Sequence, residues 1–343
     1  MDTKIKLSQI VGSYFIRYDT MNNCIGEAFK GSTATEATMY IDMYSIIKRL
    51  LQSDYSYDSH SELSALMIDM CIYYREYFKR FGVYCDFVIV CSYNLPTTNK
   101  SVIGTYNQDM ACLLAQNTEF VQQNIEYLKI LCPYLPNIHF VYTEVETGVM
   151  MYHISKMYKQ ECPSIILSKD VYNLQLLTLI PNSVFIRPKK HNGSDCSMIA
   201  YDNATEWKLF YDFMNIAPSD NLLDPVCLDH FMAITKLPQR NLPSLISSRT
   251  ILAFINSRVR DGLIRPDQFT VHYACENLNE KYRKLSGAIS DRLNVISISY
   301  QWIAYNLTAE SKTISLTNLY DPEGVKHINN VYFDKNPIDL DRL

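Results

Sequence analysis

The stretch MYIDMYSIIKRLL, residues 39–51, passes from a strand to a helix at an aspartate. Its first three residues form an apolar run that predicts the end of a strand, and residues 43–51 continue as a helix. Asp42 therefore stands at the carboxyl end of a strand and directly before a helix. Open α/β sheets bind ligands at this edge. The stretch thus predicts a fold class and a first candidate residue together.

Strand-like and helix-like segments alternate through the middle of the chain in the manner of an α/β sheet. Short apolar and β-branched runs predict strands at 86–90, 138–142, 164–167 and 184–186, and helical spacing predicts helices at 119–131 and 149–159. We therefore predict an α/β fold with a mostly parallel central sheet flanked by helices.

The sequence changes character near residue 216, after which helical segments are punctuated by prolines. We predict an α/β domain over residues 1–216, followed by a helical region with a C-terminal extension over residues 217–343. Within the second part, residues 280–293 are expected to be a helix. The run VISISYQWIAY, residues 295–305, is expected to be a strand.

Composition limits the classes of function. The formal net charge of −4 means that any binding of nucleic acid must depend on a local basic patch. The ten cysteines form no Cys-x-x-Cys pair and no zinc-spaced quartet, so we expect reduced thiols. No segment reaches the roughly 18 consecutive apolar residues of a membrane helix, and no secretory signal is recognised. We expect a cytoplasmic protein without membrane contact. Frequent Ile, Tyr, Asn and Asp with little Gly and Ala indicates an AT-rich genome, which suggests a virus or phage protein in its host cell.

Three acidic segments follow predicted strands and open helices. Asp42 is the first, the pair Glu144 and Glu146 is the second, and Asp170 is the third. Mg²⁺ takes oxygen ligands at about 2.0–2.1 Å, so carboxylates from separate strands bind one ion only if they surround a common point. Each acid also has a simpler interpretation, because an acid at a helix start caps backbone N–H groups and stabilises the helix dipole.

The order of these segments resembles the motifs of the flap endonuclease and 5′–3′ exonuclease family, whose domain is PIN-like. Asp42 and Ser45 match the family's strand-Asp-x-x-Ser-helix opening, and Glu144 and Glu146 match the first two acids of its Glu-x-Asp-Asp motif. Asp170 matches the first acid of the motif Asp-x-Asp-x-x-Gln-Leu. The resemblance implies that these four acids are the catalytic candidates.

Several family positions are changed in this chain. Ser92, Thr147 and Tyr172 stand where the family carries acids, and Lys236 stands where a Gly-Asp pair would supply another. These changes remove most ligands of the family's second metal ion and weaken the first site. The resemblance therefore implies at most one Mg²⁺ ion, or none. Its ligands would be Asp42, Glu146 and Asp170.

The parts that grip the substrate in the family are also depleted. The segment at 231–255 resembles the family's helix-three-turn-helix region, but serines replace glycines that would let backbone amides reach phosphates. Lys100 is the single basic residue of the segment 94–118, where the family carries cationic residues. The remaining candidates for phosphate contact are Arg187, Lys189, Lys190, Arg240 and Arg249. A short basic run is also commonly just solvated charge.

Two principal functions follow from these observations. The first is a divergent, catalytically impaired flap-endonuclease-like protein, an accessory or interaction subunit that binds DNA or RNA weakly and has protein partners. The alternative is a Mg²⁺-dependent 5′ nuclease that acts on DNA or RNA ends with a minimal acidic cluster. A purely structural protein is the third hypothesis. The first two hypotheses differ in whether the acidic cluster is intact.

Overall fold

The computed structural model describes residues 4–22, 25, 33–92, 118–143, 145–159, 161–188, 196–200, 223–235, 245–278, 280–308, 316, 321–333, 337–339 and 342. Four predicted site residues lie outside these ranges, namely Glu144, Lys189, Lys190 and Arg240. Lys236 and most of the segment 94–118 do as well. The expected domain boundary near residue 216 also lies outside them, so the division into two domains stays a prediction.

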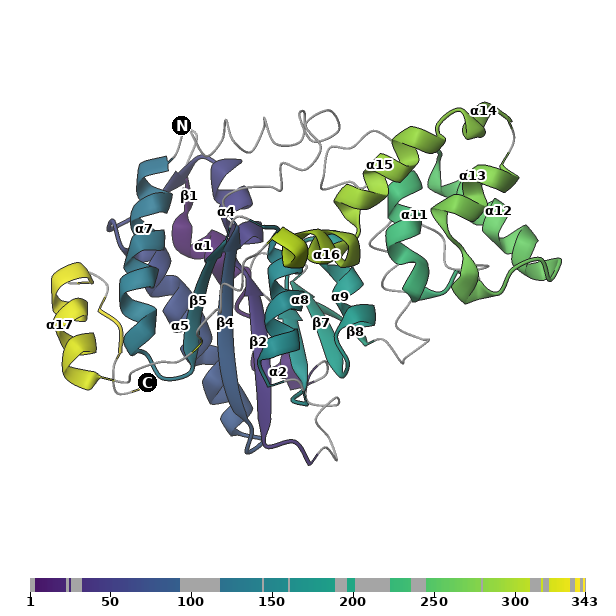
Figure 1. Ribbon diagram of the computed structural model, residues 1–343. Helices are drawn as coiled ribbons and strands as arrows, with labels where there is room; N and C mark the ends of the chain where they lie inside the picture. The colour runs from purple at the N-terminus through teal and green to yellow at the C-terminus, as the bar shows by residue number, and fades with distance from the viewer. Residues whose placement is uncertain are drawn as a thin grey trace.

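One six-stranded sheet forms the centre of the molecule, in the order β5-β4-β2-β6-β7-β8 (Figure 1). Its strands are β2 (Glu36–Asp42), β4 (Tyr84–Ser92), β5 (Ile138–Thr143), β6 (Ser164–Leu167), β7 (Ser183–Pro188) and β8 (Cys196–Ala200). The first five strands of that order pair in parallel, and β8 pairs antiparallel with β7. The predicted α/β fold with a mostly parallel sheet is confirmed.

Helices cover both faces of this sheet, which is why its strands are apolar almost throughout. In β2, Met39 and Ile41 belong to one hydrophobic core and Tyr40 to the other. The first core includes residues of α1 (Leu7–Gly12), α4 (Met43–Leu51), α5 (Glu62–Lys79), α7 (Thr118–Leu131) and α17 (Pro322–Tyr332). The second includes residues of α8 (Thr147–Met157), α9 (Leu176–Leu179) and α16 (Ile298–Thr308). Figure 1 shows α17 on the outer side of α7.

The helical region follows the sheet in sequence and contributes to the second core. Its elements are η5 (Pro225–Cys227), α11 (Leu228–Ile234), α12 (Ser248–Arg260), η6 (Pro266–Gln268), α13 (Val271–Asn277), α14 (Glu280–Arg283) and α15 (Ser286–Ile296). The remaining short elements are β1 (Ile5–Lys6), α2 (Tyr18–Met21), β3 (Tyr55–Ser56), η2 (Cys132–Tyr134) and η3 (Val171–Gln175). The helix predicted over 280–293 is interrupted between α14 and α15.

The strand expected at residues 295–305 is wrong, because this run is helical in the end of α15 and in α16. Ile298 and Gln301 are buried, whereas Tyr300 and Ile303 are 45% and 47% exposed. This inward and outward spacing is that of a helix packed on one side. α16 packs against α8 and α15, and that tertiary contact overrides the strand preference of the β-branched and aromatic residues.

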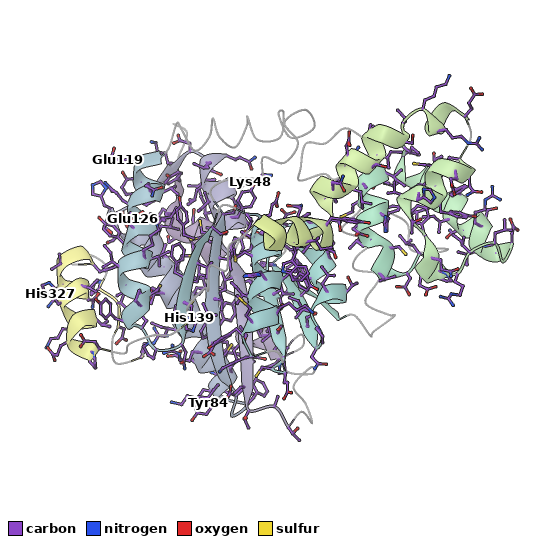
Figure 2. The ribbon with its side chains drawn as sticks, in the orientation of Figure 1. Lys48, Tyr84, Glu119, Glu126, His139 and His327 are labelled. Atoms are coloured by element: carbon purple, nitrogen blue, oxygen red, sulfur yellow. The ribbon has the colours of Figure 1, made fainter. Side chains whose placement is uncertain are left out.

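The carboxyl ends of the parallel strands lie at one edge of the sheet. In Figure 2, Lys48 of α4 lies toward this edge, and Tyr84, the first residue of β4, lies at the opposite edge. Cys71, Cys85, Cys91, Cys132, Cys162, Cys227 and Cys275 are free thiols, and five of them are buried, as expected. Among the described residues, no helix is long and apolar enough to span a membrane.

Candidate active site at the carboxyl edge of the sheet

Asp42 ends β2 and caps α4. Its Oδ1 accepts a hydrogen bond from the backbone N–H of Ser45 at 3.3 Å, and its Oδ2 accepts one from Ser45 Oγ at 2.5 Å. The Asp-x-x-Ser spacing therefore satisfies a backbone donor at the helix start, which is the common role of an aspartate at this position. The motif that suggested a metal ligand thus also builds the first turn of α4.

Two more side chains donate to the same carboxylate oxygen of Asp42. Ser168 Oγ lies 2.6 Å from Oδ2, and Asn173 Nδ2 lies 3.2 Å from it. Both residues follow β6, which is the parallel neighbour of β2. Asp42 is 0% exposed. Burial raises the pKa of the Asp42 carboxyl, while hydrogen bonds from Ser168 and Ser45 act in the opposite direction.

Asp170 lies at the same edge and is joined to Asp42 through Ser168. Its backbone N–H donates to Ser168 Oγ at 3.0 Å, and its Oδ1 accepts from the backbone N–H of Tyr172 at 3.0 Å, which caps η3. The family resemblance required Asp42 and Asp170 to lie on the same side of the fold, and they do.

Tyr172 occupies the position where the family carries a second acid. Its side chain is 1% exposed, and its hydroxyl accepts a hydrogen bond from Gln301 Nε2 of α16 at 2.8 Å. Gln175 strengthens the same junction, since its amide accepts from the N–H of Ile298 and donates to the carbonyl of Ile296, both at 2.9 Å. A phenol that contacts α16 thus stands at the position where the resemblance led us to expect a second acid.

Glu146 lies just before α8 and is 4% exposed, and its side chain makes no capping hydrogen bond. It follows β5, and β4 separates β5 from the strand that carries Asp42. Ser92 and Thr147, which stand where the family has acids, are also buried, at the ends of β4 and the start of α8. The place of Glu144 in this arrangement stays a prediction.

α8 approaches η3 closely at Gly148. A Cβ at this position would overlap the Asn173 side-chain oxygen and would lie 2.8 Å from Cδ1 of Ile298. Only glycine permits this approach. The same Asn173 Oδ1 is buried and has no hydrogen-bond partner among the described residues.

Basic side chains gather beside Asp170. Lys169 Nζ donates to Ser13 Oγ at 2.7 Å and lies 4.3 Å from the centre of the Tyr14 ring. Burial, together with the positive charges of Arg49 and Arg187, lowers the pKa of Lys169 to about 7. Burial likewise lowers the pKa of Arg187 to about 10, and Asp170 opposes that shift.

Tyr14 lies between this basic group and Asp42. It is 0% exposed, and burial raises the pKa of its phenol well above the usual value, with a further increase from the Asp42 carboxyl. Ser45 is near enough to lower that pKa, but the Tyr14 hydroxyl reaches no partner of normal hydrogen-bond geometry among the described residues.

Sequence reasoning selected Arg187 but missed Lys169, Tyr14 and Asn173. Lys169 had a usable signal, because it directly precedes Asp170 at the end of a predicted strand. Tyr14 had none, since it comes from an N-terminal segment without a recognisable motif. Arg249 is exposed in the first turn of α12, where Ser247 Oγ accepts from the N–H of Thr250 at 3.2 Å. Contacts of Arg187 and Arg249 with nucleic acid stay predictions.

The described residues do not fit a site for two metal ions. No three histidine, cysteine, aspartate or glutamate side chains within the described ranges are grouped so that they could hold a metal. Asp42 Oδ2 already accepts hydrogen bonds from Ser45, Ser168 and Asn173. Paired ions about 3.5–4 Å apart need several carboxylates around them.

No family model matches the chain, and no curated protein sequence matches it. Solved structures do. A bacteriophage T5 flap endonuclease pseudo-enzyme, in complex with DNA product and metal ions, is similar with a TM-score of 0.52 and 11% identity over 87% of this chain and 99% of that one. A zinc-bound T5 5′-exonuclease has a TM-score of 0.47 and 13% identity, and the match covers 87% of this chain and 98% of that one. Human GEN1 with Holliday junction DNA has a TM-score of 0.46 and 9% identity, and the match covers 87% of this chain and 68% of that one. The chain has the fold of the flap endonuclease and 5′–3′ exonuclease superfamily.

Proposed function

We propose that this chain, which has the flap endonuclease fold, is a catalytically impaired, nucleic-acid-associated accessory or interaction subunit. The observation that carries the proposal is the hydrogen bonding of the buried Asp42 carboxylate. Its Oδ2 accepts from the Oγ of Ser45, the Oγ of Ser168 and the Nδ2 of Asn173, and its Oδ1 accepts from the N–H of Ser45. A carboxylate oxygen has two lone pairs, so Oδ2 has none left for a metal ion. An ion bound through Oδ2 would have to displace a donor, and Oδ1 is reached only within a site that is 0% exposed.

The replacement of acids by Tyr172 and Thr147 supports the same proposal. Phosphoryl transfer by two metals depends on ions that hold both the attacking and the leaving oxygen, while cations neutralise the developing charge. Each lost contribution multiplies the loss of rate, since about 1.4 kcal/mol corresponds to tenfold. Tyr172 is buried against α16 and bonded to Gln301, so a carboxylate is missing where a second ion would need one.

Association with nucleic acid is supported by the fold and by the basic group of Lys169 and Arg187 beside Asp170. Because the net charge of the chain is −4, the binding is expected to be weak and to depend strongly on salt. An accessory role also requires protein partners. The amino-acid usage, which is typical of an AT-rich genome, supports a viral or phage origin and action in the cytoplasm of the host cell.

The test compares nuclease rates of the protein and of Asp42→Asn and Asp170→Asn on 5′-flap DNA and on structured RNA, with Mg²⁺ and with Mn²⁺. We expect near-zero and indistinguishable rates for all three proteins. Asp54→Asn is the matched control, because Asp54 is an exposed aspartate whose side chain is 70% accessible and pairs with Lys4. Robust Mg²⁺-dependent turnover that either site substitution abolishes would overturn the proposal and establish the alternative, a 5′ nuclease with a minimal acidic cluster.

A further inference from the structure

We propose that α16 is a regulatory element of the candidate site: its docking against η3 keeps Asp42 buried, and its release exposes that carboxylate. The inference concerns the control of the site and rests on the proposed function, which depends on the burial of Asp42. It assigns a task to Ile298 and Gln301, which belong to the run that the sequence predicted as a strand.

Three hydrogen bonds hold the start of α16 against η3. The side-chain oxygen of Gln175 accepts from the N–H of Ile298, and its Nε2 donates to the carbonyl of Ile296, both at 2.9 Å. Gln301 Nε2 donates to the Tyr172 hydroxyl at 2.8 Å. The side chains of Gln175, Gln301 and Tyr172 are all buried. Burial strengthens these hydrogen bonds, because water does not compete for them.

Ile298 packs on the same small area of α8 as two residues of η3. A Cβ at Gly148 would lie 2.8 Å from Cδ1 of Ile298 and 3.2 Å from Cε1 of Tyr172, and it would overlap the side-chain oxygen of Asn173. These three side chains therefore converge on one point at the start of α8. Truncation of Ile298 would leave a void there, and Tyr172 and Asn173 would lose a neighbour.

Asn173 connects this junction to Asp42. Its Nδ2 donates to Asp42 Oδ2 at 3.2 Å and to Ser168 Oγ at 3.1 Å, and Ser168 Oγ donates to the same oxygen of Asp42 at 2.6 Å. Two of the described donors to Oδ2 thus come from the segment 168–175. The start of α16 holds the far end of that segment at Gln175. If this end moved, Asn173 would move with it and uncover one side of Asp42.

The docked state also has features that favour its release. Trp302 Nε1 of α16 and Asn173 Oδ1 are buried, and neither has a hydrogen-bond partner within the described ranges. A buried polar atom without a partner raises the free energy of the docked state. On the outer face of α16, Tyr300 and Ile303 are 45% and 47% exposed, so this face contributes little to docking. A segment held in this way can open locally while the rest of the protein stays folded.

α15 links α16 to the helical region. α16 follows α15 after Ser297, whose Oγ donates to Asp229 Oδ2 of α11 at 2.8 Å. Arg292 of α15 donates to the carbonyl of Thr235, at the end of α11, also at 2.8 Å. Figure 1 shows α16 between α15 and α8. α16 therefore connects the helical region with the carboxyl edge of the sheet, and η3 is the place where this connection reaches Asp42.

The test is carbodiimide-mediated labelling of carboxylates with glycinamide, measured by peptide mass spectrometry. In the unchanged protein, Asp42 should react far more slowly than Asp54, whose side chain is 70% accessible. A buried group reacts only in the open fraction of the molecules. Gln301→Ala removes one hydrogen bond of the junction and should raise the labelling rate of Asp42 about fivefold or more. Ile298→Ala removes buried packing and should raise that rate about tenfold or more.

Ile303→Ala is the matched control, since it truncates the same type of residue in the same helix at an exposed position. Asp86 is the internal reference for unfolding. It is 4% exposed near the start of β4, where it accepts from the Tyr158 hydroxyl at 2.6 Å and pairs with Lys159 at 2.8 Å. Release of α16 should expose Asp42 and leave Asp86 protected, whereas global unfolding exposes both.

Equal labelling of Asp42 in Gln301→Ala, Ile298→Ala and Ile303→Ala would overturn the role of α16 and leave the proposed function standing, because Asp42 would still be buried. A parallel increase for Asp42 and Asp86 in the two junction variants would also overturn that role, since it would show loss of the whole fold. Labelling of Asp42 in the unchanged protein as fast as that of Asp54 would instead contradict the burial on which the proposed function depends.

Discussion

Asp42→Ala is expected to destabilise the fold by about 3 kcal/mol. The substitution removes the cap of α4, which is worth about 1 kcal/mol. It also leaves the buried donors of Ser168 and Asn173 without their acceptor, at about 1–3 kcal/mol each. Asn173 Nδ2 keeps a second acceptor in Ser168 Oγ at 3.1 Å, which reduces its share. Relief from burying a carboxylate offsets part of the rest.

Urea unfolding at neutral pH measures this effect, provided that the slope with denaturant is unchanged between the proteins. Asp54→Ala is the control, because its ion pair with Lys4 is exposed and should contribute less than about 1 kcal/mol. A carboxylate kept in place for a metal ion often lowers stability, and its removal then stabilises the protein. If Asp42→Ala were as stable as the unchanged protein, or more stable, Asp42 would not be the structural centre described above.

Two further substitutions test the packing of α8 and α16. Gly148→Ala should lower the free energy of unfolding by about 1–3 kcal/mol, because the new Cβ would lie 2.8 Å from Cδ1 of Ile298. The control is Gly287→Ala in α15, whose new Cβ meets no atom within 4 Å and which should be neutral or slightly stabilising. An equal decrease of the melting temperature in both variants would refute the steric argument. Tyr172→Phe should cost about 1 kcal/mol in urea unfolding, since it removes the 2.8 Å hydrogen bond from Gln301, and an unchanged midpoint would show that this bond does not anchor α16.

The sheet could be predicted from the sequence because its strands are buried on both faces and therefore read as apolar runs. The helix at Met43–Leu51 was bounded correctly because the Asp42 cap marks its start. The run at 295–305 misled the prediction, since nothing local shows that α8 and Tyr172 will hold it as a helix. The antiparallel β8 was not predicted either.

The candidate site was predicted less completely than the fold. Asp42 and Asp170 were placed together by the rule that parallel strands end at one edge. The roles of Asn173 and Gly148 depend on contacts between segments that are distant in sequence, so no local pattern shows them. The basic group around Lys169 has the same origin, because its members come from α4, β7 and the segment after β6.

The central claim is that the carboxyl edge of the sheet, where Asp42 is held by hydrogen bonds, does not hold a pair of metal ions. A crystal of the protein grown with Mn²⁺ tests it most directly, because anomalous scattering locates each ion. We predict no more than one ion near Asp42 and Asp170. Two ordered ions about 3.5–4 Å apart, each with carboxylate oxygens at about 2.0–2.2 Å, would contradict the account.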